Sequence, residues 1–195
     1  MIFAKLRRST IIISYKGTQV IDTTRLILRK FELTDSIHMF KNWSNDFDVC
    51  KYLSWEPHGD ISVTQQIIQD WVNSYSDDAC YNWAIIYKLS GEAIGSISLI
   101  QLDEQNESCE VGYCMSNDFW GLGIMTEALN YVIQYMFDKI GVNRIVAKHD
   151  VQNPASGKVM KKCGMKFEGI LRQSIKDRGG NFCDYASYSI LRNDI

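Results

Sequence analysis

The sequence predicts an α/β fold in one domain, with a mixed, largely antiparallel β-sheet and helices on both of its faces. Runs rich in β-forming residues dominate the middle of the chain, at residues 82–87, 93–101 and 109–115. Helical patterns lie before and after these runs, so helices are expected to cover both sides of one sheet. A chain of 195 residues fits one domain, which buries about 70% of its unfolded surface.

The first elements are expected between residues 25 and 75. Residues 25–31 alternate between apolar and polar side chains, as a strand does. Thr34 or Asp35 is expected to cap a helix that runs to about Trp43. Residues 62–65, Ser-Val-Thr-Gln, form a capping box. It begins a second helix with apolar residues at Val63, Ile67, Ile68 and Trp71.

The later elements follow from turn and stop signals. Ser90-Gly91 predicts a turn between the first two runs of the middle region, and a polar loop at 103–107 precedes the third. A long helix over 124–139 is expected to end before Gly141. A strand at 144–149 follows, and Pro154 suits the first turn of another helix. The last strands, 165–175 and 182–191, flank a glycine-rich turn at 178–181.

Two glycines at the mouth of the long helix are the strongest functional signal. Gly121 and Gly123 have no Cβ, so a ligand can approach the backbone closely. The first amides of a helix have no partner inside it, carry partial positive charge and bind phosphate. Ile124-Met125 stands where a P-loop needs Lys-Ser/Thr, and Thr126 stands where a dinucleotide fingerprint needs glycine. Taken alone, the pair fits an ordinary glycine turn equally well.

Three ordered segments give the glycines their context. Residues 24–29 resemble the opening strand of the GCN5-related N-acetyltransferase (GNAT) superfamily, in the branch that includes the ribosomal-protein N-acetyltransferases. Residues 111–113 and 120–128 resemble its fourth strand and pyrophosphate loop. Residues 153–165 resemble the helix that closes over the cofactor, and 167–172 resemble the strand after it. The order and spacing fit nearly the whole chain.

The resemblance implies a GNAT-type domain whose strands 4 and 5 splay apart, with acetyl-CoA as co-substrate in the gap. Main-chain groups of Tyr113 and Met115 would bind its pantetheine, Asn153 the pantetheine or a bridging water, and Lys158 the 3′-phosphate region. Trp120 fits the branch, whereas Met125 is bulkier than the family's usual residue. The backbone amides that would hold the diphosphate are those of Gly121, Leu122, Gly123, Ile124, Met125 and Thr126.

Two residues are candidates for the chemistry. Glu110, beside the gap, is either a general base for the amine or a residue that orients the substrate. Many superfamily members carry a tyrosine acid seven residues after the equivalent of Asn153, but Met160 stands there. Ser156 fits the branch pattern and is either the acid for the CoA sulfur, or a relay to one, or an ordinary first-turn serine.

The acceptor is a primary amine. An α-amine has a pKa of about 7.7–8.0, against about 10.4 for lysine, so a site with one carboxylate and no tyrosine acid favours a protein N-terminus. A small-molecule amine, such as an aminoglycoside, amino sugar or polyamine, is the alternative. A non-catalytic acyl-CoA sensor is the rival of another class. Trp55 and His58 are expected to contact the acceptor, although a loop histidine without a catalytic role is the favoured interpretation of His58.

Direct transfer in a ternary complex is expected, because no cysteine stands in a recognisable nucleophile setting. The alternative is a covalent acetyl-enzyme formed on Cys109 or Cys114, which lie near the gap. The six cysteines form no Cys-x-x-Cys pair and no metal-ligand spacing, so we expect no metal and reduced thiols in a cytoplasmic protein.

Bulk properties limit the partners. A net charge of −2 gives no support for a nucleic-acid surface, and no apolar run is long enough to span a membrane. Residues 1–21 are expected to be an extension without the features of a signal peptide, and 22–195 the acetyltransferase domain. The extension either adds a strand at 9–15 with a turn at Lys16-Gly17, or pairs two copies into a homodimer.

Overall fold

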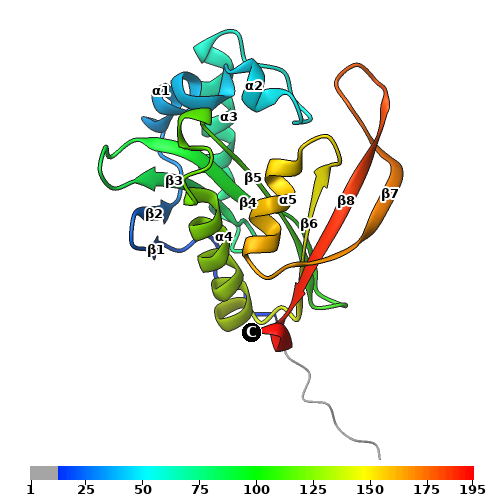
Figure 1. Ribbon diagram of the computed structural model, residues 1–195. Helices are drawn as coiled ribbons and strands as arrows, with labels where there is room; N and C mark the ends of the chain where they lie inside the picture. Colours follow the sequence, from blue (N-terminus) through cyan, green and yellow to red (C-terminus); the bar gives the residue numbers. More distant parts are fainter. Residues whose placement is uncertain (1–12) are drawn as a thin grey trace, which may run out of the picture.

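Residues 13–195 are described by the computed structural model, and their strands form one sheet in the order β1-β2-β3-β4-β5-β6-β8-β7 (Figure 1). Neighbouring strands are antiparallel except β5 and β6, which are parallel. The expected mixed, largely antiparallel sheet is therefore confirmed. The strands are β1 Ile21–Asp22, β2 Leu26–Arg29, β3 Asn82–Tyr87, β4 Ala93–Asp103, β5 Ser108–Met115, β6 Arg144–Asp150, β7 Lys166–Lys176 and β8 Phe182–Leu191.

The parallel pair at the centre of the sheet separates part-way along its length. β5 and β6 are in register from Ser108 opposite Arg144 to Val111 opposite Ala147. Beyond that point β5 stays paired with β4 as far as Met115, while β6 stays paired with β8. The two strands therefore diverge after Val111, as the expected splay requires, and we call this region the splay.

Helices cover both faces of the sheet (Figure 1). α4 and α5 pack on one face, and α1, α2 and α3 lie on the other. α1 and α4 each run on into a wider helical turn, at Phe40–Ser44 and Met136–Ile140. The bounds are α1 Asp35–Met39, α2 Phe47–Cys50, α3 Ile61–Ser74, α4 Ile124–Tyr135 and α5 Pro154–Lys162, with short helical turns at Asn117–Phe119 and Arg192–Asp194.

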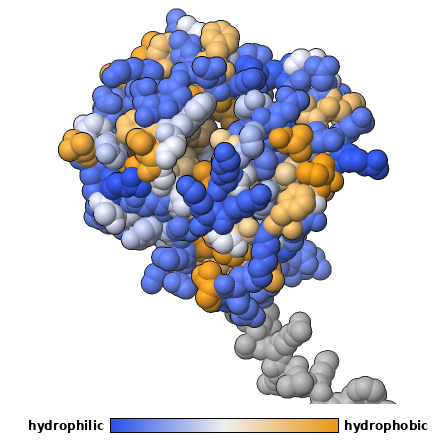
Figure 2. All heavy atoms as spheres, in the orientation of Figure 1, coloured by the Kyte–Doolittle hydropathy of each residue, from blue (hydrophilic) through white to orange (hydrophobic). Residues whose placement is uncertain are grey.

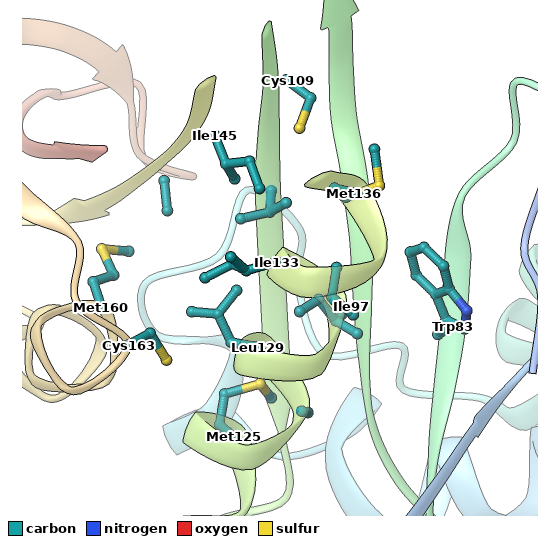
Figure 3. Packing of buried hydrophobic residues seen from close by; sticks show 14 of the residues in the cluster. Trp83, Ile97, Cys109, Met125, Leu129, Ile133, Met136, Ile145, Met160 and Cys163 are labelled. Atoms are coloured by element: carbon teal, nitrogen blue, oxygen red, sulfur yellow. The ribbon is translucent and has the colours of Figure 1, made fainter. Parts of the chain in front are cut away.

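The larger core lies between the sheet, α4 and α5 (Figure 3). Apolar residues of α4 recur at helical spacing, and Leu129 and Met136 are fully buried there. Ile145 of β6 and Met160 of α5 complete the packing around them. The smaller core, on the other face, holds Phe31, Met39, Trp43, Val49, Ile68, Ala84, Ile86 and Ala93. Packing of α4 in the larger core holds the start of this helix, and the glycine loop before it, against the sheet.

One expected helix cap holds in position only, and the other is wrong. Thr34 stands at the N-cap position of α1, as expected, but makes no side-chain cap bond, and the Asp35 carboxylate accepts from Arg29 at 2.7 and 2.9 Å. α3 begins at Ile61 and not inside the expected capping box. Its cap is Asp60, an extended residue whose carboxylate accepts from the amide of Ser62 at 2.8 Å. Gly141 ends the α4 segment at φ 94°, which confirms the expected stop.

The segment before β1 lies against the domain. A strand was expected at 9–15; residues 1–12 lie outside the described part, and residues 13–15 form no strand. The amide of Ser14 instead donates to the carbonyl of Ile140 at 2.8 Å, and that of Gly17 to Asp78 at 2.8 Å. Gly17 has φ 60°, in keeping with the expected turn. In the described part of the chain, no helix combines the length and hydropathy that a membrane span requires.

Candidate active site

The loop between β5 and α4 presents a row of free backbone amides. Gly121 and Gly123 have φ of 78° and 74°, which glycine adopts without strain. A Cβ placed at Gly121 would meet nothing within 4 Å, so the backbone there faces open space. Across residues 13–195, no oxygen accepts a hydrogen bond from the amides of residues 121–126, whereas the amide of Glu127 is bonded to the carbonyl of Gly123. Such a cradle of donors suits an anion.

An ion pair from Arg25, directly before β2, supports this loop. Glu127, in the first turn of α4, accepts from Arg25 Nε at 2.7 Å, from the Arg25 amide at 2.8 Å and from Thr23 at 2.6 Å. Arg25 also donates to the carbonyl of Leu122 at 3.0 Å. Burial acts to raise the pKa of Glu127, but the bonds from Thr23 and Arg25 outweigh it and the pKa is lowered. Arg25 balances the resulting charge, so the helix start remains attractive to an anion.

Sequence reasoning gave neither Arg25 nor Glu127 a role, although both lie in the segments that carry the resemblance. Trp120 was noted only as a match to the branch pattern. Its indole Nε1 donates to the carbonyl of Met115 at 3.0 Å, which ties the loop to the end of β5.

Two residues of β5 direct their main-chain N–H and C=O groups toward the splay. The amide of Ser116 donates to Ile94 of β4, so alternation places the N–H and C=O groups of Tyr113 and Met115 on the opposite side, away from β4. The Met115 carbonyl already accepts from Trp120. Among residues 13–195, the main-chain groups of this stretch that find no partner at the splay are thus the Met115 amide and the N–H and C=O of Tyr113.

α5 brings Ser156 to the same place. Asn153 caps α5 and accepts from the Ser156 amide at 3.3 Å. The Ser156 hydroxyl donates to the Tyr113 hydroxyl at 3.0 Å, and that hydroxyl donates to the Ser156 carbonyl at 3.0 Å. Burial raises the pKa of Tyr113, so the phenol keeps its proton at neutral pH. Met160, at the usual tyrosine position, is buried in the core. A phenol therefore stands beside Ser156 after all, but it comes from β5.

Glu110 lies on the other face of β5, one residue before the pairing with β6 ends. Its carboxylate is 2.6 Å from the ammonium of Lys148 on β6, and both side chains are mostly buried. Lys148 was not singled out in the sequence, because nothing local shows that β6 pairs with β5 and places Lys148 two residues past Val146, the residue opposite Glu110. Lys158 is exposed on α5.

A cavity of about 640 Å³ lies between the helices α1 and α3 and the strands β4 and β5. Its floor includes Gly112, Tyr113 and Cys114, the part of β5 that has left β6, so the cavity reaches the splay. Trp55 and His58 line it, from the connection between α2 and α3. No Asp, Glu, Lys or Arg is among its lining residues. The remaining lining is chiefly aromatic, aliphatic or hydroxyl-bearing, and includes Trp43, Trp71, Tyr81, Leu53, Ile67, Leu99, Ser54, Ser96 and Ser98.

His58 is held in a fixed orientation at this cavity. Its Nδ1 lies 2.7 Å from the hydroxyl of Thr64, which lies 3.2 Å from the hydroxyl of Ser44. The ring packs against Trp55 with centroids 5.1 Å apart. Burial lowers the pKa of His58, so the imidazole is neutral at neutral pH.

An ion pair joins the β7–β8 hairpin to the connection between α2 and α3. Arg178, at the turn of the hairpin, lies 2.6 Å from Glu56 in the connection that carries Trp55 and His58. The structure thus brings Trp55, His58, Tyr113 and Ser156 around one region of the sheet. Glu110 lies on the same face of β5 as Gly112, two residues and about 7 Å along the strand. Of the described residues, no group of three His, Cys, Asp or Glu side chains is placed to hold a metal ion.

Comparisons with known proteins agree with this architecture. Residues 25–166 match the family model described as the acetyltransferase (GNAT) domain. An N-acetyltransferase named p20 from Bacillus licheniformis is 34% identical over 173 residues, covering 88% of this chain and 96% of p20. The ribosomal-protein-serine acetyltransferase of Escherichia coli (strain K12) is 34% identical over 83 residues, covering 43% of this chain and 46% of that protein.

A solved structure shows the same fold. The microcin C7 self-immunity acetyltransferase MccE, in complex with acetyl-CoA and AMP, superposes with a TM-score of 0.78 at 24% identity, covering 93% of this chain and 99% of that chain. With the family match over most of its length, the chain belongs to the GNAT acetyltransferase family and is an N-acetyltransferase. The acetyl donor of this family is acetyl-CoA.

Proposed function

We propose that this N-acetyltransferase transfers acetyl directly to the α-amine of a protein N-terminus, within a ternary complex. The observation that carries the proposal is the pair of sites that meet at the splay. On one side lie the free amides of residues 121–126, and on the other lies a cavity whose floor includes Gly112 and Tyr113. A donor and an acceptor bound there would meet without a covalent enzyme intermediate.

The residues present fit acetyl-CoA. Amides of Gly121, Leu122, Gly123, Ile124, Met125 and Thr126 would hold the diphosphate, as they are free and lie at a helix N-terminus. Tyr113 and the Met115 amide would pair with the pantetheine, together with Asn153 at the start of α5. Lys158 would approach the 3′-phosphate from the exposed side of α5.

Protons are handled by two groups in this proposal. The amine nitrogen attacks the thioester carbonyl, the C–S bond breaks, and the amine loses a proton while the sulfur gains one. Glu110 would receive the amine proton, through water where it does not reach directly, or orient the amine. The Ser156 hydroxyl would supply the proton to sulfur and recover one from water after the products leave, while the Tyr113 hydroxyl, 3.0 Å away, would hold Ser156 in position.

Small-molecule amines are the alternative acceptors. Polyamines and aminoglycosides carry several positive charges, and a cavity without carboxylates does little to bind them. The E. coli relative is named for a ribosomal protein, which favours a protein acceptor for this branch.

Pairing of two copies also remains part of the proposal. Apolar side chains gather over the β7–β8 hairpin (Figure 2), and Phe167, Ile170 and Phe182 are each about half exposed or more. Light scattering with size-exclusion chromatography tests this, because a monomer mass across the accessible concentration range would remove it.

The experiment that tests the proposed function is release of free thiol from acetyl-CoA. The purified protein is incubated with acetyl-CoA and a panel of N-terminal peptides, amino-sugar amines and polyamines. Thiol release that depends on a peptide with a free α-amine, and stops when that amine is blocked, supports the proposal. Release with small amines alone favours the alternative. Tight CoA binding without release across the panel favours a sensor.

A further inference from the structure

The residues that line the acceptor cavity indicate which class of amine it binds. We propose that it binds an uncharged, apolar group attached to the reacting amine, so the preferred acceptor is an α-amine followed by an aliphatic or aromatic side chain. This inference rests on the proposed function and adds a substrate class to it. It also predicts which amines the protein rejects, namely those with a second positive charge near the first.

The lining carries the argument for charge. Twenty residues line the cavity, and none is Asp, Glu, Lys or Arg. A second ammonium group would lose its water there without gaining a carboxylate, which is strongly unfavourable. Lysine side chains and polyamines place such a group within reach of the cavity walls. An acidic side chain would be rejected for the same reason, because no cation lines the walls.

The titratable lining groups do not restore a charge. Burial lowers the pKa of His58 and raises the pKa values of Tyr81, Tyr113 and Cys114. Each of these four shifts favours the neutral form at neutral pH. Two ion pairs lie next to lining residues: Glu56, beside Trp55, pairs with Arg178, and Glu110, two residues from Gly112, pairs with Lys148. Each pair is closed within itself at 2.6 Å. The cavity is therefore uncharged as well as largely apolar.

Size and shape support an amino-acid side chain as the occupant. The volume of about 640 Å³ falls within the range of small-molecule sites, and Trp43, Trp55 and Trp71 provide flat apolar walls. Ser96 and Ser98 stand on the floor beside Gly112, where hydroxyls can pair with the peptide groups of a bound N-terminus. An aliphatic or aromatic side chain would bury its surface against the indoles, and its amine would lie toward the splay.

Steady-state thiol release from acetyl-CoA with simple α-amine acceptors tests the proposal. Leucinamide and phenylalaninamide should show a kcat/KM at least about tenfold above that of lysinamide, aspartic acid α-amide and spermidine. Equal or better turnover of lysinamide or spermidine by the natural sequence would overturn the inference and leave the acetyltransferase activity intact.

Variants that place a carboxylate in the cavity sharpen the test. Ser98→Asp on the floor and Ser54→Asp on the connection should each lower kcat/KM for leucinamide about tenfold and improve lysinamide relative to it. Ser90→Asp, in the exposed turn between β3 and β4 and outside the cavity, is the matched control and should change neither. Because Ser54 is exposed, its variant tests the idea even if Ser98→Asp folds poorly.

Binding separates failure of this inference from failure of the proposed function. Saturation-transfer NMR on the protein with CoA present reports contact without turnover. Contact by leucinamide but not lysinamide, with no acetylation of any amine, would support the cavity assignment and reject the function. Acetylation with no preference, or a preference unchanged in both aspartate variants, would reject the cavity assignment alone.

Discussion

Lys148 holds Glu110 in place, with its ammonium 2.6 Å from the carboxylate across the last paired residues of β5 and β6. One carboxylate oxygen is therefore already engaged at the point where the strands diverge. Glu110 can act as a base only if this pair opens or if a water reaches the other oxygen. The role of Glu110 therefore depends on whether its second carboxylate oxygen is accessible to the amine or to a water.

Glu110→Gln is predicted to lower kcat about 100-fold, because general-base catalysis contributes about 100-fold or more. Lys148→Met keeps the carboxylate and removes only its partner, so it should lower kcat less than Glu110→Gln does. Steady-state thiol release measures both variants, and a Glu110→Gln variant that keeps the full rate would show that Glu110 neither receives the proton nor orients the amine.

The Tyr113–Ser156 pair is predicted to act as one unit. Tyr113→Phe and Ser156→Ala should each lower kcat about tenfold, and the double variant should fall no further, because the two hydroxyls share one hydrogen bond of 3.0 Å. Burial raises the pKa of Tyr113, so any alkaline limb due to this phenol must lie above its ordinary value of about 10. Additive losses in the double-mutant cycle would show that the residues act independently.

The Arg25–Glu127 ion pair is predicted to set affinity for the donor. Arg25→Gln should weaken CoA binding about tenfold, because it removes a charged hydrogen bond to Glu127 and the contact with Leu122 that supports the loop. Arg29→Gln is the matched control four residues further along the chain, since Arg29 pairs with Asp35 and not with the loop. Calorimetric titration with CoA measures both. Equal losses in the two variants would count against a specific role for Arg25.

His58 is predicted to make the protein less stable as the pH is lowered. Its folded pKa lies below its ordinary value of about 6.5, so the unfolded chain binds more protons between the two pKa values. Stability from this group is complete above pH 6.5 and is lost as the pH falls toward the folded pKa. His58→Gln should flatten this part of the curve, as measured by urea unfolding between pH 5 and 8. An unchanged slope would show that His58 is not buried as described.

Some features could be predicted from local sequence because their causes are local. Gly141 ends its helix through its own backbone conformation, and the glycine loop before α4 depends on residues that are neighbours in the chain. The expected cap of α3, Ser62, lies two residues after the actual cap, Asp60, whose carboxylate accepts from the Ser62 amide at 2.8 Å.

The contacts that organise the site could not be predicted from local sequence, because they join residues that are far apart in the chain. Arg25 and Glu127 are 102 residues apart, and Tyr113 and Ser156 are 43 apart. No spacing rule links residues so distant until the sheet order places β2 near α4, and β5 near α5. The position seven residues after Asn153, where many superfamily members carry a tyrosine, holds Met160. The phenol that contacts Ser156 comes instead from Tyr113 on β5.

The central claim is that the diphosphate of CoA binds the free amides after Trp120. Titration of ¹⁵N-labelled protein, with the backbone amide signals followed by NMR, tests it most directly. CoA should move the signals of residues 121–126 strongly, and pantetheine, which lacks the diphosphate, should leave them nearly unchanged. Binding of CoA without shifts in these six amides, or no binding of CoA at all, would contradict the account.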